Sequence, residues 1–365
     1  MSRDEAEGRR TLGARLQRYH GVSLEQVLGE VRYLRDEGDS VIAGGSLAYG
    51  LGNRLSDLDL VVAGSTTAHS SRVPLEHFVG SLRVDVWKLA RDLIEATFER
   101  AERALAFAGE LHDSFGEFDQ ETEPKLLHRI AHGVLVDGAG LDPAPGRDYA
   151  GVASGLVVRD CAERMRASAL VARLALAAGR PVAAVVNARR AVEEALGATI
   201  ADRGLPFSGD KWLGERLAAE AADLAPLHEP FRRLPDVPAR GAEPFVERAL
   251  STCAFLWGLD LRLEALAGLA GWRSSGTRLA EVGEERFLLS VRHGAVWSLD
   301  AEEAEAWRGL AGASGAEEEG ATWRLGDCEG KAASLCLCLH EHGLLDLTWV
   351  TGLRVEDLEA TRAAA

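Results

Sequence analysis

The sequence has no excess of positive charge. Its 41 lysine and arginine residues are outnumbered by 57 aspartate and glutamate residues, and the formal net charge is -16. Binding along a DNA or RNA backbone depends on neutralising phosphates with Lys and Arg, so this balance excludes a broad nucleic-acid-binding surface and predicts no nucleic-acid polymer among the partners. A small anion such as a nucleoside triphosphate stays compatible, provided that a local loop and a metal ion offset the charge.

Long apolar runs and a disulfide framework are missing as well. A membrane-spanning helix needs about eighteen apolar residues, whereas the best candidate, ALVARLALAAG, is short and contains Arg173. The N-terminal sequence MSRDEAEGRR is too charged for a signal peptide. Five scattered cysteines do not resemble a disulfide framework. We therefore expect a cytoplasmic protein without a membrane partner, and its length allows two or three domains.

The pattern of residues 1–145 predicts an α/β (α+β) domain with a mixed sheet. Ser23 and Gln26 form a capping box that opens a helix running to about Asp36. Alternating or apolar stretches predict strands. These stretches are 40–45, 57–64, 81–89 and, as a strand or a helix end, 133–138.

Two further domains follow, after a boundary rich in glycine and proline at 138–148. Residues 146–275 predict an α-helical domain, with a helical pattern over 149–273. Residues 276–352 predict a hairpin turning at His293–Gly294, a helix capped by Asp300 and Glu303, a second helix stopped at Gly343, and a short extended stretch. We expect residues 353–365 to form a frayed tail.

Two aspartates at the start of an apolar strand are the most informative feature of the sequence. Asp57 and Asp59 are two residues apart, so a strand projects both to the same side, where the two charges repel. Asp85 similarly interrupts a valine-rich strand. If the two strands are neighbours, three carboxylates converge, as two-metal phosphoryl or nucleotidyl transfer requires. Alternatively, all three are solvated residues at strand starts and on outward faces.

A glycine-rich turn precedes the aspartate pair. Gly44, Gly45 and Ser46 offer backbone N–H groups and a hydroxyl to a phosphate, because glycine lets the main chain approach closely. A glycine turn upstream and a third aspartate downstream favour the catalytic interpretation over the structural one.

Residues 25–140 therefore resemble the polymerase-beta-like nucleotidyltransferase superfamily. Its pattern is a glycine–serine pair, a short spacer, Asp-x-Asp on a strand and a third acid on a later strand. The resemblance implies transfer of NMP from an NTP, with ATP as the expected donor, and two magnesium ions. It implies that Asp57 and Asp59 bind both metals, and that Asp85 holds the catalytic metal and helps to activate the acceptor.

The resemblance also implies a nucleotide-binding set. This set comprises Gly44, Gly45, Ser46, Arg54, Ser56 and Lys211. Tyr49 departs from the pattern, because small-molecule and toxin-type members often have an arginine after the serine; Arg54 is the candidate substitute. Lys211 is one of only four lysines and suits a γ-phosphate, although a solvated loop lysine is an equal alternative.

The helical domain resembles that of aminoglycoside and related antibiotic nucleotidyltransferases, in which it shapes the acceptor pocket. Asn187, Arg190 and Glu194 fall at helical spacing and are weak candidates for lining this pocket; the alternative is the polar side of a helix. The acidic balance suits a cationic acceptor.

The C-terminal segment resembles the small winged-helix-like, PQQ-chaperone-like module that binds leader peptides. The resemblance is based on the strand–turn–strand pattern of FLLSVRHGAVWSL, on the helix capped by Asp300, and on Trp307 within that helix. The resemblance implies that a peptide adds as a strand to its edge. A generic winged helix or a dimerisation element stays open. The pattern of Cys336, Cys338, His340 and His342 invites zinc, but a buried helix is favoured because residues two apart diverge on a helix.

The combined prediction is a magnesium-dependent nucleotidyltransferase that acts on a hydroxyl or amine of a small-molecule or peptide acceptor. Three alternatives stay open: an antibiotic adenylyltransferase, a toxin–antitoxin protein nucleotidyltransferase, and an inactive nucleotide- or peptide-binding regulator. A homodimer is also left open.

Overall fold

The computed structural model describes most of the chain, in segments. They are residues 3–64, 73–106, 123–139, 141, 148–205, 210–233, 241–258, 261, 269–273, 277–283, 285–290, 295–312, 322–324, 330–341 and 345–349. The chain divides into two compact units, the first comprising Met1–Asp160 and Gly197–Asp223, the second Cys161–Leu196 and Leu224–Ala365. The predicted domain limits stay predictions.

The first unit is an α/β structure. Its elements in chain order are α1 (Arg3–His20), α2 (Leu24–Glu30), η1 (Arg32–Leu34), β1 (Ser40–Gly44), α3 (Gly45–Ala48), β2 (Leu58–Gly64), β3 (Leu75–Val79), β4 (Leu82–Ala90), α4 (Arg91–Ala106), α6 (Glu123–His132), β5 (Val134–Asp137), the start of α7 (Tyr149–Ala177), the end of α8 (Pro181–Asp202), η3 (Asp210–Trp212) and α9 (Leu213–Glu220). The predicted strands at 40–45, 57–64, 81–89 and 133–138 correspond to β1, β2, β4 and β5.

These strands form one five-stranded mixed sheet. Its order is β3-β4-β2-β1-β5, with β2 and β4 parallel and the other neighbours antiparallel. The prediction of a mixed sheet is confirmed, and the condition set for convergence of the carboxylates, that the strands carrying Asp59 and Asp85 are neighbours, is met. The edge strand β3 and helix α1 were not among the predicted elements.

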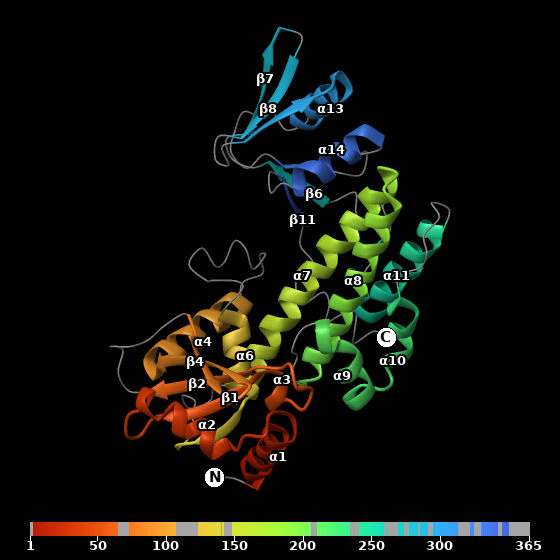
Figure 1. The fold of residues 1–365 in the computed structure, drawn as a ribbon. Coiled ribbons are helices and arrows are strands. Elements are labelled where there is room, and N and C mark those ends of the chain that lie inside the picture. Colours follow the sequence, from red (N-terminus) through yellow and green to blue (C-terminus); the bar gives the residue numbers. More distant parts are fainter. Residues whose placement is uncertain are drawn as a thin grey trace. The chain divides into compact units, whose positions relative to one another are not determined.

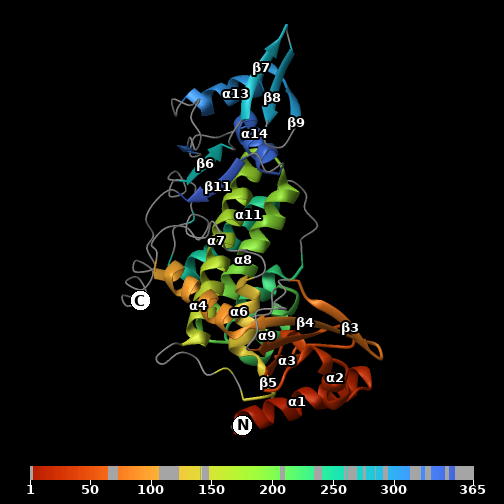
Figure 2. The same cartoon turned by 90° about the vertical axis from the view of Figure 1, so that its left-hand side faces the viewer.

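Alternation along β2 and β4 gives the sheet two buried faces. Leu58 and Leu60 pack with α1 and α2 on one face, whereas Val61 and Trp87 pack with α4 and α6 on the other. Figure 1 shows the sheet between these two pairs of helices, and Figure 2 shows the same layers from the side. Side chains at odd positions of both strands therefore share the α4/α6 face, which is where Asp59 and Asp85 lie.

The capping box predicted for α2 is present. The Ser23 Oγ accepts from the Gln26 backbone N–H at 3.1 Å, and the Gln26 side chain accepts from the Ser23 N–H at 2.7 Å. The helix ends at Glu30, so the expectation that it reaches Asp36 was too long. Val31 leaves the α-helical conformation with ψ 6°, and the chain continues as the 3-10 helix η1. A turn follows, in which the Asp39 carboxylate accepts from the Asp36 N–H at 2.9 Å.

The second unit combines helices with two small sheets. Its helical elements are the rest of α7, most of α8, α10 (Ala225–His228), η4 (Glu229–Phe231), α11 (Ala242–Trp257), α13 (Ala301–Gly312) and α14 (Gly330–Glu341). Its strands are β6 (Leu269–Arg273), β7 (Thr277–Val282), β8 (Glu285–Ser290), β9 (Ala295–Leu299), β10 (Thr322–Arg324) and β11 (Leu345–Trp349), in the sheets β10-β6-β11 and β7-β8-β9. The Trp257 indole donates to the Ala195 carbonyl at 3.0 Å and ties α11 to α8.

The helical pattern predicted over 149–273 is wrong at its end. Residues 269–273 form strand β6, which pairs with both β10 and β11. Its partners come from 322–324 and 345–349, so tertiary pairing overrides the local pattern. Among the helices within the described ranges, none is long and apolar enough to cross a membrane.

Candidate active site

The glycine turn lies directly against an aspartate. Gly44 ends β1 and stands opposite Asp59 in the antiparallel register. Gly45 has φ 76°, and a Cβ atom built there would lie 2.0 Å from the Asp59 Oδ2. The left-handed backbone favours glycine, and the close carboxylate excludes any side chain. Position 45 therefore requires glycine, because of both its own backbone conformation and the neighbouring Asp59 carboxylate.

Asp59 and Asp85 lie side by side. They are register partners on the parallel strands β2 and β4 and share the α4/α6 face of the sheet. Their side chains are 8% and 6% exposed, whereas that of Asp57, just before β2, is 41% exposed. We name Asp57, Asp59 and Asp85 the acidic edge.

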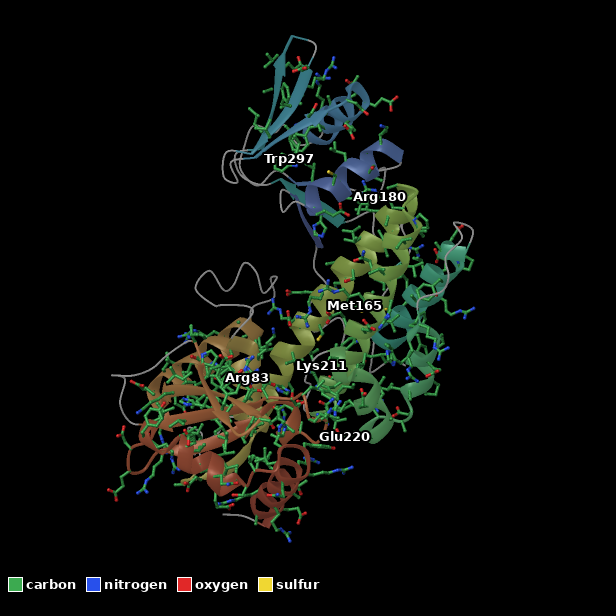
Figure 3. All side chains as sticks on the ribbon, in the orientation of Figure 1. Arg83, Met165, Arg180, Lys211, Glu220 and Trp297 are labelled. Carbon is green, nitrogen blue, oxygen red and sulfur yellow. The ribbon has the colours of Figure 1, made fainter. Side chains whose placement is uncertain are left out.

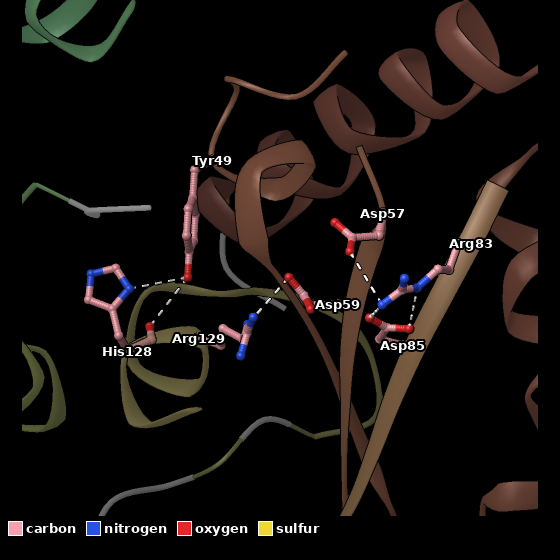
Figure 4. Close-up of polar contacts among 7 residues, drawn as sticks. All are labelled: Tyr49, Asp57, Asp59, Arg83, Asp85, His128 and Arg129. Atoms are coloured by element: carbon pink, nitrogen blue, oxygen red, sulfur yellow. Dashed lines mark hydrogen bonds and ion pairs between the residues drawn. The ribbon is translucent and has the colours of Figure 1, made fainter. Parts of the chain in front are cut away.

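Two arginines compensate the acidic edge (Figure 4). Arg83 donates from Nε and Nη2 to the two oxygens of Asp85 at 2.9 and 2.7 Å, and its Nη2 lies 3.9 Å from Asp57. Arg83 also pairs with Glu76 at 3.1 Å. The Nε of Arg129, on α6, lies 3.3 Å from the Asp59 Oδ2, and its guanidinium lies over the Trp87 ring.

Asp59 remains electrostatically strained despite its arginine partner. Burial raises the pKa of Asp59 to about 6; Arg129 opposes this shift, and the charges of Asp57 and Asp85 add to it. The three carboxylates thus interact, and a cation added beside them would favour the charged form of Asp59.

The donor set of the acidic edge has the chemistry that magnesium prefers, because carboxylate oxygens are hard ligands. The raised pKa of the buried Asp59 fits a site built for an additional cation. The side chains, however, are engaged with arginines, and within the described residues no three carboxylate, imidazole or thiol groups are arranged to hold one metal ion. An ion would therefore have to displace the Arg83 guanidinium from Asp57 and Asp85.

The serines and Arg54 of the predicted nucleotide-binding set lie near the glycine turn in the chain. Ser46 is buried, and its carbonyl accepts from the N–H groups of Leu51 and Gly52 at 2.9 Å. The Ser56 hydroxyl accepts from the Asn53 N–H at 3.0 Å and closes the loop before Asp57. Arg54 is exposed on that loop.

Lys211 belongs to the first unit, in η3. Its ammonium lies 5.4 Å from the centre of the Trp212 ring. Figure 3 shows Lys211 and Glu220 at the two ends of the η3–α9 segment. Lys211 is exposed, and no contact described for it reaches the acidic edge. Its role as a phosphate contact stays a prediction.

The three candidates on α8 have structural partners. The Asn187 amide donates to the Ala183 carbonyl at 2.9 Å. Glu194 is buried and pairs with Arg164 at 2.9 Å and with Arg190 at 3.9 Å. These contacts explain Asn187, Arg190 and Glu194 as structural residues without an acceptor pocket, although the buried Glu194 does not lie on a solvated polar side of the helix.

Sequence reasoning missed the groups that surround the acidic edge. Arg83 is two residues before Asp85 in an alternating strand, so the period of two was a usable signal for it. His128 and Arg129 had none, because their place depends on how α6 packs. Gly44 lets α6 pack here, since a Cβ on Gly44 would lie 2.8 Å from the Arg129 Cβ.

Beside Arg129 lies a second group of polar side chains. The Tyr49 hydroxyl lies 3.4 Å from the His128 Nδ1, and the His128 and His132 ring centres are 4.5 Å apart. Burial lowers the pKa of His128 to about 3, and the charges of Arg216 and Arg129 act in the same direction. In the view of Figure 4, the Asp59–Arg129 pair lies between Tyr49–His128 and Asp57–Arg83–Asp85.

The predicted hairpin, capped helix, second helix and extended stretch correspond to β8–β9, α13, α14 and β11, but the structure adds strand β7 before the hairpin and strand β10 between the two helices. β8 and β9 form the hairpin, while the turn at His293–Gly294 lies outside the described residues. Asp300 and Glu303 cap α13 reciprocally at 2.9 and 2.7 Å, and Trp307 is buried. The winged-helix-like module stays a prediction.

The segment with Cys336, Cys338 and His340 is helix α14, as favoured over the zinc site. Cys336 is buried, and Cys338 is half-buried. His342 lies outside the described residues. The helix directs residues two apart away from each other, which argues against a shared zinc ion.

No protein-family model matches the chain, and no curated protein matches it. Among solved structures, the chain is similar to a nucleotidyltransferase-like protein from Exiguobacterium sibiricum 255-15, with 11% sequence identity and a TM-score of 0.32. The similarity covers 63% of this chain and 74% of that one.

Proposed function

We propose that the protein is a magnesium-dependent nucleotidyltransferase that moves an NMP group from an NTP, with ATP as the expected donor, to a hydroxyl or amine of a small-molecule or peptide acceptor. One observation carries the proposal: the buried carboxylates of Asp59 and Asp85 lie in register on parallel strands, and Asp59 lies against the Gly45 turn. Burial and the charges of Asp57 and Asp85 disfavour the charged form of Asp59, which a cationic ligand would favour.

Asp57 and Asp59 would hold the two magnesium ions, and Asp85 would hold one of them. When bound, magnesium would neutralise the phosphates and polarise the reacting phosphorus. The half-exposed Asp57 is the group nearest to solvent, so it would meet the hydrated ion first. Arg83, released from Asp57 and Asp85, would keep Glu76 as its partner.

The reaction balances without a further reactant. The acceptor oxygen or nitrogen forms a bond to the α-phosphorus, the bond to the bridging oxygen of pyrophosphate breaks, and the acceptor proton passes to solvent. Gly44, Gly45 and Ser46 would orient the triphosphate through the turn. Further contacts would come from Arg54, Ser56 and Lys211.

The C-terminal segment supports the proposal of a peptide acceptor. Strand β9 is an edge of the sheet β7-β8-β9, and an extended leader peptide would add to such an edge through backbone hydrogen bonds. A peptide acceptor would then be delivered with its leader bound there. Co-purification of a short peptide supports this acceptor, whereas resistance of a sensitive host to an antibiotic supports the small-molecule alternative.

The first experiment is calorimetric titration of ATP, GTP, CTP and UTP with magnesium into the wild type and Asp57→Asn/Asp59→Asn. Metal-dependent binding of one nucleotide that the double variant loses supports the proposal and identifies the donor. A folded wild type that binds none of the four would contradict it.

A non-catalytic regulator is the second candidate. The engagement of Asp85 and Asp57 by Arg83 favours it, since such pairing leaves fewer ligand positions for an ion. A purely regulatory domain would bind the nucleotide but would release no pyrophosphate from it, whichever extract is added as a source of acceptor. Pyrophosphate release that depends on Asp85 would exclude this candidate.

A further inference from the structure

Arg216, on α9, is a buried guanidinium with two unused donors. It is 2% exposed, and its Nη1 pairs with Glu220 one turn further along the helix. Among the described residues, its Nε and Nη2 have no hydrogen-bond partner. A buried charged donor without an acceptor is costly, so such a pair of atoms is expected to serve a ligand.

The neighbours of Arg216 are also groups that can donate. Burial lowers the pKa of His128 and of His132, and the Arg216 charge adds to both shifts; burial raises the pKa of Tyr49, and the Arg216 charge opposes that shift, so Arg216 lies near all three. His128 is 4% exposed, and the His132 Nε2 lies 3.3 Å from the Ser154 hydroxyl. We name Arg216, Tyr49, His128 and His132 the Arg216 cluster.

Carboxylates near this cluster do not occupy the unused donors. Glu220 pairs with Nη1 of Arg216, and Asp59 pairs with Arg129. Asp148 acts on His132 by raising its pKa, against the larger lowering effect of burial. The cluster therefore combines a permanent positive charge, two imidazoles and a phenol around donors that lack an acceptor.

We infer that the Arg216 cluster is a binding site for a phosphoryl oxyanion that requires no metal ion. Nε and Nη2 lie on the same side of a guanidinium and form a fork that matches two oxygens of a phosphate. An imidazole N–H can donate to a remaining oxygen, and the Tyr49 hydroxyl, which donates to the His128 carbonyl at 3.4 Å, lies beside it. A carboxylate has two oxygens, so it would leave part of this donor set unused.

The phosphoryl group can come from the tail of the proposed nucleotide or from free phosphate. Tyr49 directly follows α3, which begins at Gly45, so the cluster is close in the chain to the proposed triphosphate turn. The identification of the nucleotide tail rests on the proposed function; the oxyanion site itself does not.

The test is calorimetric titration of inorganic phosphate, pyrophosphate and ATP in excess EDTA. The wild type should bind at least one of them, and Arg216→Lys should weaken binding at least tenfold, because lysine keeps the charge but lacks the fork. His128→Gln is a second variant in case the first fails to fold. Arg203→Gln is the matched control, because Arg203 pairs with Asp223 elsewhere in the first unit.

Tighter binding of ATP than of inorganic phosphate identifies the nucleotide tail as the ligand, and equal binding identifies free phosphate. The inference is overturned if the wild type binds none of the three, or if both variants bind them as the wild type does. Asp57→Asn/Asp59→Asn should keep metal-free binding. A wild type that binds without metal but gains no magnesium-dependent nucleotide binding would therefore count against the proposed function and leave this site intact.

Discussion

The acidic edge and the Arg216 cluster lie in the same unit but differ in charge and in how that charge is met. The acidic edge collects three carboxylates, and two arginines engage them. The Arg216 cluster collects groups that donate, and two nitrogens of its arginine have no acceptor among the described residues. The acidic edge thus suits an added cation and the Arg216 cluster an added anion, and a nucleotide with its metal supplies both.

The two regions also respond to acid in opposite directions. The pKa of Asp59 is raised from 3.8 to about 6, so its burial lowers stability as the pH rises through this range. The pKa of His128 is lowered from 6.5 to about 3, so its burial lowers stability as the pH falls below 6.5. Substitutions of Asp59 and of His128 should therefore change the pH dependence of the free energy of unfolding in opposite directions.

The largest effect is expected from Gly45→Ala, which breaks the acidic edge. A left-handed backbone costs alanine about 1–2 kcal/mol, and its Cβ would also displace the Asp59 carboxylate. We expect loss of magnesium-dependent nucleotide binding, measured by calorimetry. Gly21→Ala is the matched control, because Gly21 has φ 69° with nothing within 4 Å of its Cβ position. Equal nucleotide binding by both variants would contradict the prediction.

Asp59→Asn should stabilise the protein while it removes metal binding. The shift of the Asp59 pKa corresponds to about 2 kcal/mol lost from the wild type between pH 4 and neutral pH. The variant should lack this loss, so its free energy of unfolding should exceed that of the wild type at pH 7.5 and approach it at pH 4. Urea unfolding at both values measures the difference. An unchanged pH dependence would show that Asp59 is not strained.

His128→Gln should change the pH dependence in the other direction. Keeping His128 neutral costs the wild type about 2 kcal/mol at pH 5 relative to neutral pH. The variant should lose less stability than the wild type between pH 7 and pH 5, measured by urea unfolding. A steeper loss in the variant would contradict the assignment of His128 to a site that keeps it neutral.

Arg83→Gln should strengthen magnesium binding, because it removes a cation from the acidic edge. Because Arg83 and an ion would share Asp57 and Asp85, we expect about tenfold tighter magnesium binding without nucleotide, roughly 1.4 kcal/mol. Arg35→Gln is the control, since Arg35 pairs with Asp137 away from the edge. Weaker magnesium binding by the Arg83 variant would instead make Arg83 a group that positions the carboxylates.

The smallest effect is expected from Lys211→Gln. Lys211 is exposed and lies over Trp212, so a single solvated charge should weaken nucleotide binding by about threefold. Lys125→Gln, on α6, is the control for net charge. An effect above tenfold would place Lys211 directly on the phosphates.

The sequence predicted the parts of the site that local pattern controls. Asp59 and Asp85 interrupt apolar alternation, and Gly45 marks a turn, so each carries its signal within a few residues. The interpretation of the three aspartates required the strands β2 and β4 to be neighbours, and the observed register shows that they are.

The remaining parts depend on packing between distant segments. Arg129 reaches Asp59 because α6 packs over Gly44, and Arg216 lies near His128 because the distant segment Gly197–Asp223, which contains α9, belongs to the first unit. Residues 269–273 similarly form strand β6 because they pair with strands that lie far along the chain. Neither amphipathic period nor spacing contains these relations, so single-sequence reasoning had no signal for them.

The register of β2 has a consequence for how reliably this sheet assembles. A slip by one residue would turn Asp59 toward the face where Leu58 and Leu60 pack with α1 and α2, and would turn those leucines to the α4/α6 face. The same holds for Asp85 between Val84 and Val86. The carboxylates therefore penalise misaligned pairings, so the residues proposed for chemistry also help the chain to select one alignment of its strands during folding.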